Sequence, residues 1–275
     1  MTSVTAELLV VRKRSSTWIL LGIWSALAVL FAYVIPYVEY LNGSSTSGLE
    51  PLLPQELSGN LLGGFPFFGG VFALMLGVLA LGSEFGWGTL KTLFIQRPGR
   101  LHVFGAKVIA LGAVLVPFVL SVFVLGAGAS YVIALREGAE VGWPSAWLLV
   151  RALAAGWVIL AVWATFGVLL AVVSRGTSLA IGIGILYALV VEGLISAFAS
   201  AVSWLEPVTE FFLRANAYSL VRPLGLSVDD AAGNGPGAFS GPYVDGAQAL
   251  LVLAVYATVF LLTSALLVRR RDVQV

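Results

Sequence analysis

Residues 108–135 read VIALGAVLVPFVLSVFVLGAGASYVIAL, a run without a single charged side chain. About 20 predominantly apolar residues in a helix cross the roughly 30 Å hydrocarbon core of a bilayer. The run is therefore long enough to span a membrane with some tilt. It also excludes a transmembrane β-barrel, because barrel strands alternate apolar and polar residues.

Five other segments carry the same signature, so we expect six transmembrane helices. In chain order the six cover residues 18–38, 63–83, 108–135, 146–173, 179–203 and 247–268. The composition agrees, because 59% of the 275 residues are hydrophobic and 11% are charged, whereas soluble proteins have about 25% charged residues. The sequence therefore predicts an all-α polytopic membrane protein with a single transmembrane domain over residues 1–275.

Basic side chains gather on one side of this scheme. Of the 15 lysines and arginines, 11 precede the first span, follow spans two and four, or end the chain: Arg12, Lys13, Arg14, Lys91, Arg97, Arg100, Lys107, Arg175, Arg269, Arg270 and Arg271. The positive-inside rule then predicts a multi-pass protein of the bacterial plasma membrane. Both termini lie in the cytoplasm, and residues 42–62 and 204–246 lie outside.

Residues 4–14 form a predicted helix ahead of the first span. Val4, Leu8 and Val11 share one side of it. The basic residues at its end meet the anionic inner leaflet, which favours an amphipathic helix lying on the membrane. The alternative is an ordinary basic flank of the first span.

Residue types exclude several kinds of chemistry. The chain has no cysteine and one histidine, His102, so a zinc protease with two histidine ligands is impossible. None of the three lysines follows a glycine, as the phosphate-binding Gly-x-x-x-x-Gly-Lys loop requires. We therefore expect no enzyme and no cofactor in this chain. The net charge of +1 gives no sign of nucleic-acid binding.

Residues 84–107 join spans two and three on the predicted cytoplasmic side. Thr89 is a suitable helix N-cap, and Pro98 and Gly99 end the helix in a turn. The helical spacing of Trp87, Leu90, Leu93 and Phe94 gives this segment an apolar face. Such a helix suits docking into the groove of a partner. The alternative is an interfacial helix that only anchors the loop.

This loop resembles the coupling loop of ABC-2-type permeases, the membrane subunits of ABC exporters. The shared features are an acid at the end of span two, a Gly-Thr pair, a short apolar helix, Pro-x-Arg and a lysine at span three. The resemblance implies a coupling role for Glu84, Gly88, Thr89, Lys91, Pro98 and Arg100. Leu93 and Phe94 are the predicted apolar contacts.

The overall plan is similar to that family too, with six spans, both ends inside and a helical segment outside between spans five and six. The resemblance implies an export permease in the lipid bilayer, paired with a second copy or a homologue. A separate ABC ATPase subunit is implied to bind ATP and magnesium. The few intramembrane charges favour an amphipathic or hydrophobic substrate. The alternatives are a secondary transporter and a non-transporting scaffold or assembly subunit.

Glu192 is an acid inside the fifth predicted span. An acid at mid-helix costs about 2.5–3.5 kcal/mol on insertion scales, so it should face the bundle. Small residues at spacing four, Gly184, Ala188 and Ser196, let another helix approach on this side. Glu192 and Ser196 are therefore candidates for a substrate path. The alternative is a structural hydrogen bond.

The outer segment of residues 204–246 is predicted to begin with a helix. Val208, Phe211, Phe212 and Ala215 fall at i, i+3, i+4 and i+7, the spacing of one helical face. We therefore expect one helix over about residues 207–226, at or within the outer membrane interface. The rest is a loop rich in Gly, Asp and Pro.

Overall fold

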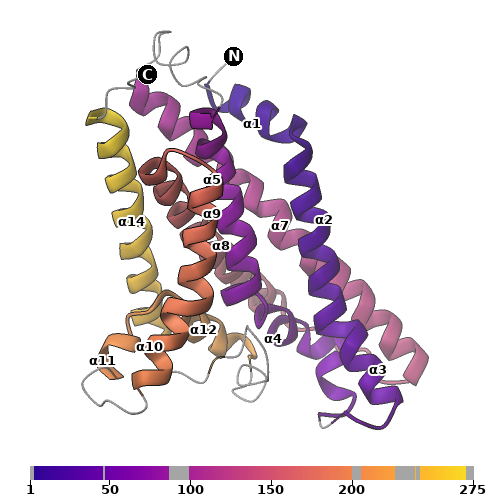
Figure 1. Cartoon of the computed structure of the whole chain (residues 1–275). Helices are drawn as coiled ribbons and strands as arrows, with labels where there is room; N and C mark the ends of the chain where they lie inside the picture. The colour runs from indigo at the N-terminus through magenta and orange to yellow at the C-terminus, as the bar shows by residue number, and fades with distance from the viewer. Residues whose placement is uncertain are drawn as a thin grey trace.

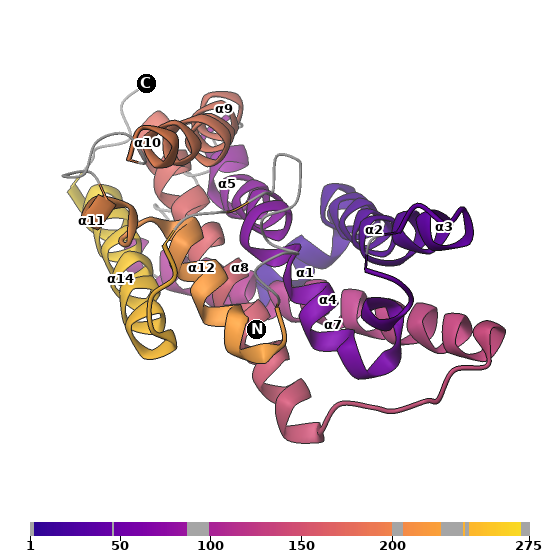
Figure 2. The same cartoon turned by 90° about the horizontal axis from the view of Figure 1, so that it is seen from below.

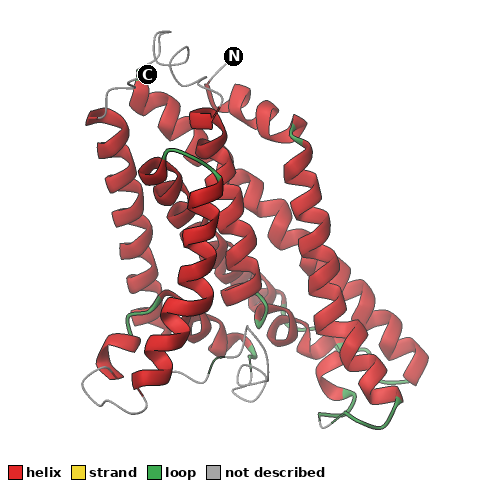
Figure 3. Ribbon diagram, in the orientation of Figure 1, coloured by secondary structure: helices red, strands yellow, loops and turns green. Residues whose placement is uncertain are grey.

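The computed structural model describes residues 3–45, 47–86, 99–199, 206–226, 239 and 242–270. All regular elements within these ranges are helices, and none of these residues lies in a strand (Figure 3). The all-α prediction is confirmed for this part of the chain.

The first third of the chain forms a helix pair and a helical return. The elements are α1 (Ser3–Lys13), α2 (Ser15–Val29), the π-helical turn η1 (Leu30–Val34), α3 (Ile35–Leu41), η2 (Glu50–Leu52), η3 (Pro54–Glu56), α4 (Leu57–Leu62), the π-helical turn η4 (Phe65–Gly69) and α5 (Gly70–Gly86). A helix is thus present where the sequence predicts one ahead of the first span.

The remaining elements include the three longest helices. They are α7 (Arg100–Glu137), α8 (Ala146–Ser174), α9 (Ser178–Leu186), the π-helical turn η5 (Tyr187–Val191), α10 (Glu192–Ala199), α11 (Glu206–Thr209), α12 (Leu213–Val221), η7 (Arg222–Leu224) and α14 (Gly246–Arg270).

Five helices in the described ranges are long and apolar enough to cross a membrane: Ser15–Leu41, Phe65–Ser83, Arg100–Glu137, Ala146–Ser174 and Gly246–Arg270. They coincide with five of the predicted spans, so the protein has the helices of a membrane-embedded chain. The predicted fifth span, residues 179–203, corresponds to α9, η5 and α10. Its apolar stretch Ser178–Val191 is shorter than the other five, and the charged Glu192 follows it.

The helices run between two ends of an elongated bundle (Figure 1). α1, the start of α7, the turn between α8 and α9 and the end of α14 lie at one end. α3, α10, α11 and α12 lie at the other, which Figure 2 shows from below. α1 and the C-terminal end of α14 therefore lie at the same end of the bundle (Figure 1).

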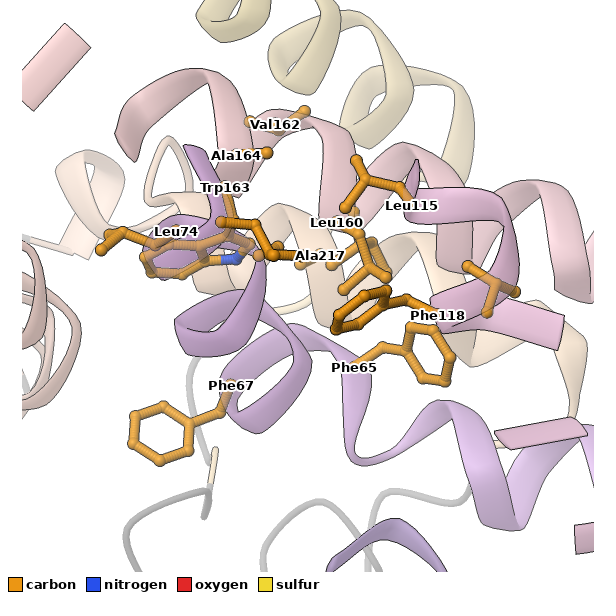
Figure 4. Packing of buried hydrophobic residues seen from close by; sticks show 14 of the residues in the cluster. Phe65, Phe67, Leu74, Leu115, Phe118, Leu160, Val162, Trp163, Ala164 and Ala217 are labelled. Carbon is orange, nitrogen blue, oxygen red and sulfur yellow. The ribbon is translucent and has the colours of Figure 1, made fainter. Parts of the chain in front are cut away.

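α8 is the central helix and packs closely on α5. A Cβ atom at Gly77 of α5 would lie 1.9 Å from the Ala164 carbonyl oxygen. In return, a Cβ at Gly167 of α8 would lie 2.2 Å from the Leu74 carbonyl oxygen. Glycine at both positions lets the two backbones touch. The side chains around this contact, among them Trp163 (Figure 4), fill the core.

The chain after α10 differs from the prediction of one helix over about residues 207–226. α11 ends at Thr209, and α12 begins only at Leu213, after Phe212 takes an extended conformation. Phe211 is therefore 54% exposed, whereas Ala215 is 1% exposed. The prediction of a single amphipathic helix is wrong, because hydrogen bonds to distant residues at the break, described below, override the local periodicity.

Candidate functional site

The predicted coupling residues are placed only in part. Gly88, Thr89, Lys91, Leu93, Phe94 and Pro98 lie outside the described residues. Glu84 belongs to the last turn of α5, and Arg100 is the first residue of α7. The predicted coupling helix itself lies outside the described residues. The end of α5 and the start of α7, which flank it in the sequence, lie at the end of the bundle that also carries α1 (Figure 1).

Arg14 holds the last turns of α5 beside this segment. It separates α1 from α2 with an extended backbone, and its guanidinium reaches across to α5. Nη1 donates to the Leu79 carbonyl oxygen at 2.7 Å, and Nη2 donates to the Ser83 hydroxyl oxygen at 2.9 Å. Ser83 lies immediately before Glu84, so these two hydrogen bonds hold α5 directly before the predicted coupling loop.

Lys107 holds the other flank of the same segment. Its Nζ donates to a carboxylate oxygen of Glu7 in α1 at 2.8 Å, and the side chains are 4% and 15% exposed. This ion pair joins α1 to the third turn of α7. A small cleft between α1, α2, α5 and α7 is lined in part by Glu7, Arg14, Thr17 and Lys107.

The sequence pattern alone did not pair these groups. Arg14 and Ser83 are 69 residues apart, and Glu7 and Lys107 are 100 residues apart. Local spacing identifies residues on one face of one helix, but it carries no information on such distant partners. The available signal was that charged side chains near predicted span ends need partners once they are buried.

Glu192 lies at the start of α10 and is 2% exposed. One carboxylate oxygen accepts hydrogen bonds from the Tyr187 hydroxyl at 2.8 Å and the Leu213 backbone N–H at 3.0 Å. The other accepts from the Arg214 backbone N–H at 3.2 Å. Leu213 and Arg214 are the first two residues of α12. The carboxylate therefore caps the N-terminus of a helix that lies 21 residues further along the chain.

The π-helical turn η5 explains how Tyr187 reaches this carboxylate. Residues five apart lie almost one above the other in a π-helix, since its hydrogen bonds run from i to i+5. Tyr187 and Glu192 have this spacing, and the α-helical spacing used for the sequence prediction did not pair them. The small residues on the same side behave as predicted, because Gly184 packs against the Leu74 side chain and Ala188 is fully buried.

Arg214 and Asn216 hold α12 in its seat. The Arg214 guanidinium lies 4.9 Å from the centre of the Phe67 ring in η4 and donates to the Ala188 carbonyl oxygen at 3.5 Å. The Asn216 amide donates to the Glu210 and Phe212 carbonyl oxygens, both at 2.8 Å. Arg214 is only 6% exposed, and the sequence pattern alone does not identify it as a site residue.

α14 and the residues directly before it, 242–245, contact α12 and the turn that precedes it from the other side. The Tyr256 hydroxyl donates to the Phe211 carbonyl oxygen at 2.9 Å, and the Val244 N–H donates to the Ser219 hydroxyl at 3.0 Å. Next to this contact, burial raises the pKa of Tyr243, while the Arg222 guanidinium, 4.7 Å from its ring centre, opposes that rise.

The arrangement around Glu192 favours a structural role for its carboxylate. Both oxygens are engaged by donors of the chain itself, and the group is buried, so the geometry supports the hydrogen-bond alternative. The substrate path through Glu192 and Ser196 stays a prediction. Ser196 lies one turn further along α10, and its side chain is not described. Among the described residues, no group of three or more His, Asp or Glu is placed to hold a metal ion.

Comparison with known proteins places the chain in a family. No curated protein matches it. A family model with the description "Protein of unknown function (DUF2705)" matches residues 24–274. The match begins within the first predicted span and includes every later helix of the bundle. The chain therefore belongs to the DUF2705 family.

Proposed function

We propose that this chain is the membrane-spanning permease subunit of an ATP-driven exporter. It crosses the bilayer six times with both termini in the cytoplasm, pairs with a second copy or a homologue, and docks on a separate ABC ATPase subunit through residues 84–107. The cargo class that fits the apolar spans is an amphipathic or hydrophobic molecule. The resemblance of the loop to that of ABC-2-type permeases motivates the proposal.

The observation that carries the proposal is the way the loop's flanks are held. Arg14 hydrogen-bonds α5 directly before the loop, and Glu7 forms an ion pair with Lys107, the last residue of the loop, within α7. Both contacts are made by α1 and by the residue that follows it, Arg14. A loop that receives a mechanical push needs such rigid flanks, because a freely hinged loop would absorb the movement. This construction suits a coupling loop better than a loop that merely anchors itself in the interface.

The course of the helices also supports six crossings. α9, η5 and α10 continue one another from one end of the bundle to the other (Figure 1). With this crossing included, an even number of passes returns the chain to its starting side, as the shared end of α1 and α14 requires. The basic residues at this end, among them Arg12, Lys13, Arg269 and Arg270, favour the cytoplasmic side.

The outer end has the features of a closed exit. α12 is a short helix whose residues are almost all buried, and its N-terminus is capped by Glu192 within the bundle. An exporter in its resting state needs its outer end sealed against leakage. A capped, buried helix at that end provides a seal that a conformational change can open.

The test is co-expression with candidate ATPase subunits, starting with one encoded beside this chain. The proposal expects a stable complex whose ATP hydrolysis depends on the permease. The double variant Leu93→Asp/Phe94→Asp should abolish co-purification while the permease still inserts. The matched control, Thr92→Asp/Gln96→Asp, adds the same charges off the predicted apolar face and should retain the complex.

Three results would contradict this function. An active complex that withstands Leu93→Asp/Phe94→Asp refutes docking through the loop. Transport by the purified chain alone, driven by an ion gradient, would identify a secondary transporter. A stable complex with another membrane protein, without any transport, would identify a scaffold.

A further inference from the structure

The turn between α8 and α9 contains an unusual backbone conformation. Arg175 follows the last residue of α8 with φ 56° and ψ 30°, in the left-handed region, and its N–H donates to the Ala171 carbonyl oxygen. Among the described residues it is the only one other than glycine with a positive φ. The Ser174 hydroxyl donates to the Gly176 carbonyl oxygen at 3.1 Å, which closes the turn.

The end of α7 uses the same cap with a different residue. Gly138 has φ 64° and ψ 24°, and its N–H donates to the Ala134 carbonyl oxygen. Glycine adopts this conformation without steric penalty, whereas an L side chain brings its Cβ too close to the carbonyl oxygen that follows. At the proposed outer end of the bundle, the left-handed position is therefore occupied by glycine, which adopts it without strain. At the proposed inner end, the same position is occupied by Arg175, whose Cβ atom makes this backbone conformation strained.

The turn lies against the end of α5. A Cβ atom at Gly82 would be 3.0 Å from the Thr177 methyl carbon and 3.2 Å from the Gly176 carbonyl oxygen. Gly82 lies two residues before Glu84, where the proposed coupling loop begins. Figure 3 shows the turn between α8 and α9, drawn in green, beside the end of α5. Arg175 therefore projects from a fixed backbone next to the surface where the ATPase is proposed to dock.

The Arg175 side chain is exposed, and within the described ranges no hydrogen bond or ion pair holds its guanidinium. Positive charge at the C-terminus of a helix is favourable by itself, but a lysine or arginine inside the last turn gives that benefit without backbone strain. An anionic lipid headgroup is likewise reached by a long flexible side chain from any nearby position. A fixed direction is useful when the cation must meet one particular group.

We propose that Arg175 is a second docking point for the ATPase subunit and binds a carboxylate, Asp or Glu, on its surface. The inference rests on the proposed function and adds a partner chemistry to it. Guanidinium and carboxylate pair through two parallel hydrogen bonds, which a directed arginine exploits. The basic character of this end of the bundle makes an acidic surface the complementary one.

The test measures ATPase binding to the full-length permease in nanodiscs made first of neutral and then of anionic lipid. Arg175→Gly and Arg175→Asn both remove the charge and suit the left-handed backbone, so the permease should melt at the same or a higher temperature. Binding should nevertheless weaken about tenfold or more, equally in both lipids. Raising the salt concentration should weaken wild-type binding and hardly affect that of the two variants.

Several outcomes would overturn the inference. Variants that bind as tightly as wild type, while wild type binds well, refute it and leave the proposed function intact. An effect seen in anionic lipid alone assigns the arginine to lipid headgroups. Recovery of binding in Arg175→Gly/Glu84→Gln would mean that the cation only neutralises Glu84. If the wild-type chain binds no ATPase at all, the proposed function fails first.

Discussion

Replacing Glu192 by glutamine should loosen α12 from the end of the bundle that also carries α3, α10 and α11. The carboxylate accepts three hydrogen bonds, from the Tyr187 hydroxyl and the N–H groups of Leu213 and Arg214. A glutamine side chain has one acceptor oxygen and one donor amide, so at least one of these buried donors faces another donor. Leaving such a donor unpaired costs about 1–3 kcal/mol.

The lost charge adds to this cost. A carboxylate at a helix N-terminus contributes about 0.3–1 kcal/mol when exposed and up to about 2 kcal/mol when partly buried. The seat of α12 should therefore weaken by about 2–4 kcal/mol in Glu192→Gln. Glu210→Gln is the matched control, because it removes a neighbouring acid whose carboxylate caps no helix in the described part of the chain.

A thiol on α12 reports this opening directly, because the native chain has no cysteine. Ser219 is 1% exposed, so a thiol introduced by Ser219→Cys reacts only when α12 leaves its seat. A change of about 2 kcal/mol in the opening free energy raises the labelling rate by about 30-fold. The comparison is made between two proteins that both carry Ser219→Cys, with and without Glu192→Gln.

Equal labelling rates and equal melting temperatures in these two proteins would refute the capping role. A third outcome separates structure from transport. If Glu192→Gln leaves α12 closed but slows export at equal protein level, the carboxylate belongs to the substrate path after all.

Three further predictions follow from the packing and the charge distribution. Glu7→Gln or Lys107→Met should each lower the free energy of unfolding by about 3 kcal/mol, since the remaining charge, which is largely buried, loses this ion pair; the double variant should melt higher than the Lys107→Met single variant, and additive losses would contradict the pair. Gly77→Ala should prevent folding, because its Cβ would meet the α8 backbone at 1.9 Å, whereas Gly22→Ala, with nothing within 4 Å, should fold normally. A thiol introduced by Gly48→Cys should react in intact cells, and reaction only after the inner face is opened would reverse the predicted topology.

The five long apolar helices could be predicted from the sequence because each depends on a local property, the length of an apolar run. The same locality explains the failures. The break before α12 depends on a carboxylate 21 residues earlier and on Tyr256, 45 residues later. The hydrogen bond from Arg14 to Leu79 joins residues 65 positions apart, and the ion pair of Lys107 with Glu7 joins residues 100 positions apart. The sequence identified Glu192 as a buried acid, but only the fold could show which donors it meets.

The continuous helix of η4 and α5 links the two polar ends of the molecule. At one end it is held by Arg14 at Leu79 and Ser83, and at the other its Phe67 ring packs on the Arg214 guanidinium. Between them, the backbone contacts at Gly77 leave no room for α5 to slide along α8 without moving it. We therefore expect a displacement at Ser83 to move α5 and α8 together and to reach the contacts of α12. In an outward-open state we therefore expect the polar contacts at the two ends to change first, because the close backbone contact at Gly77 and Gly167 holds α5 and α8 together.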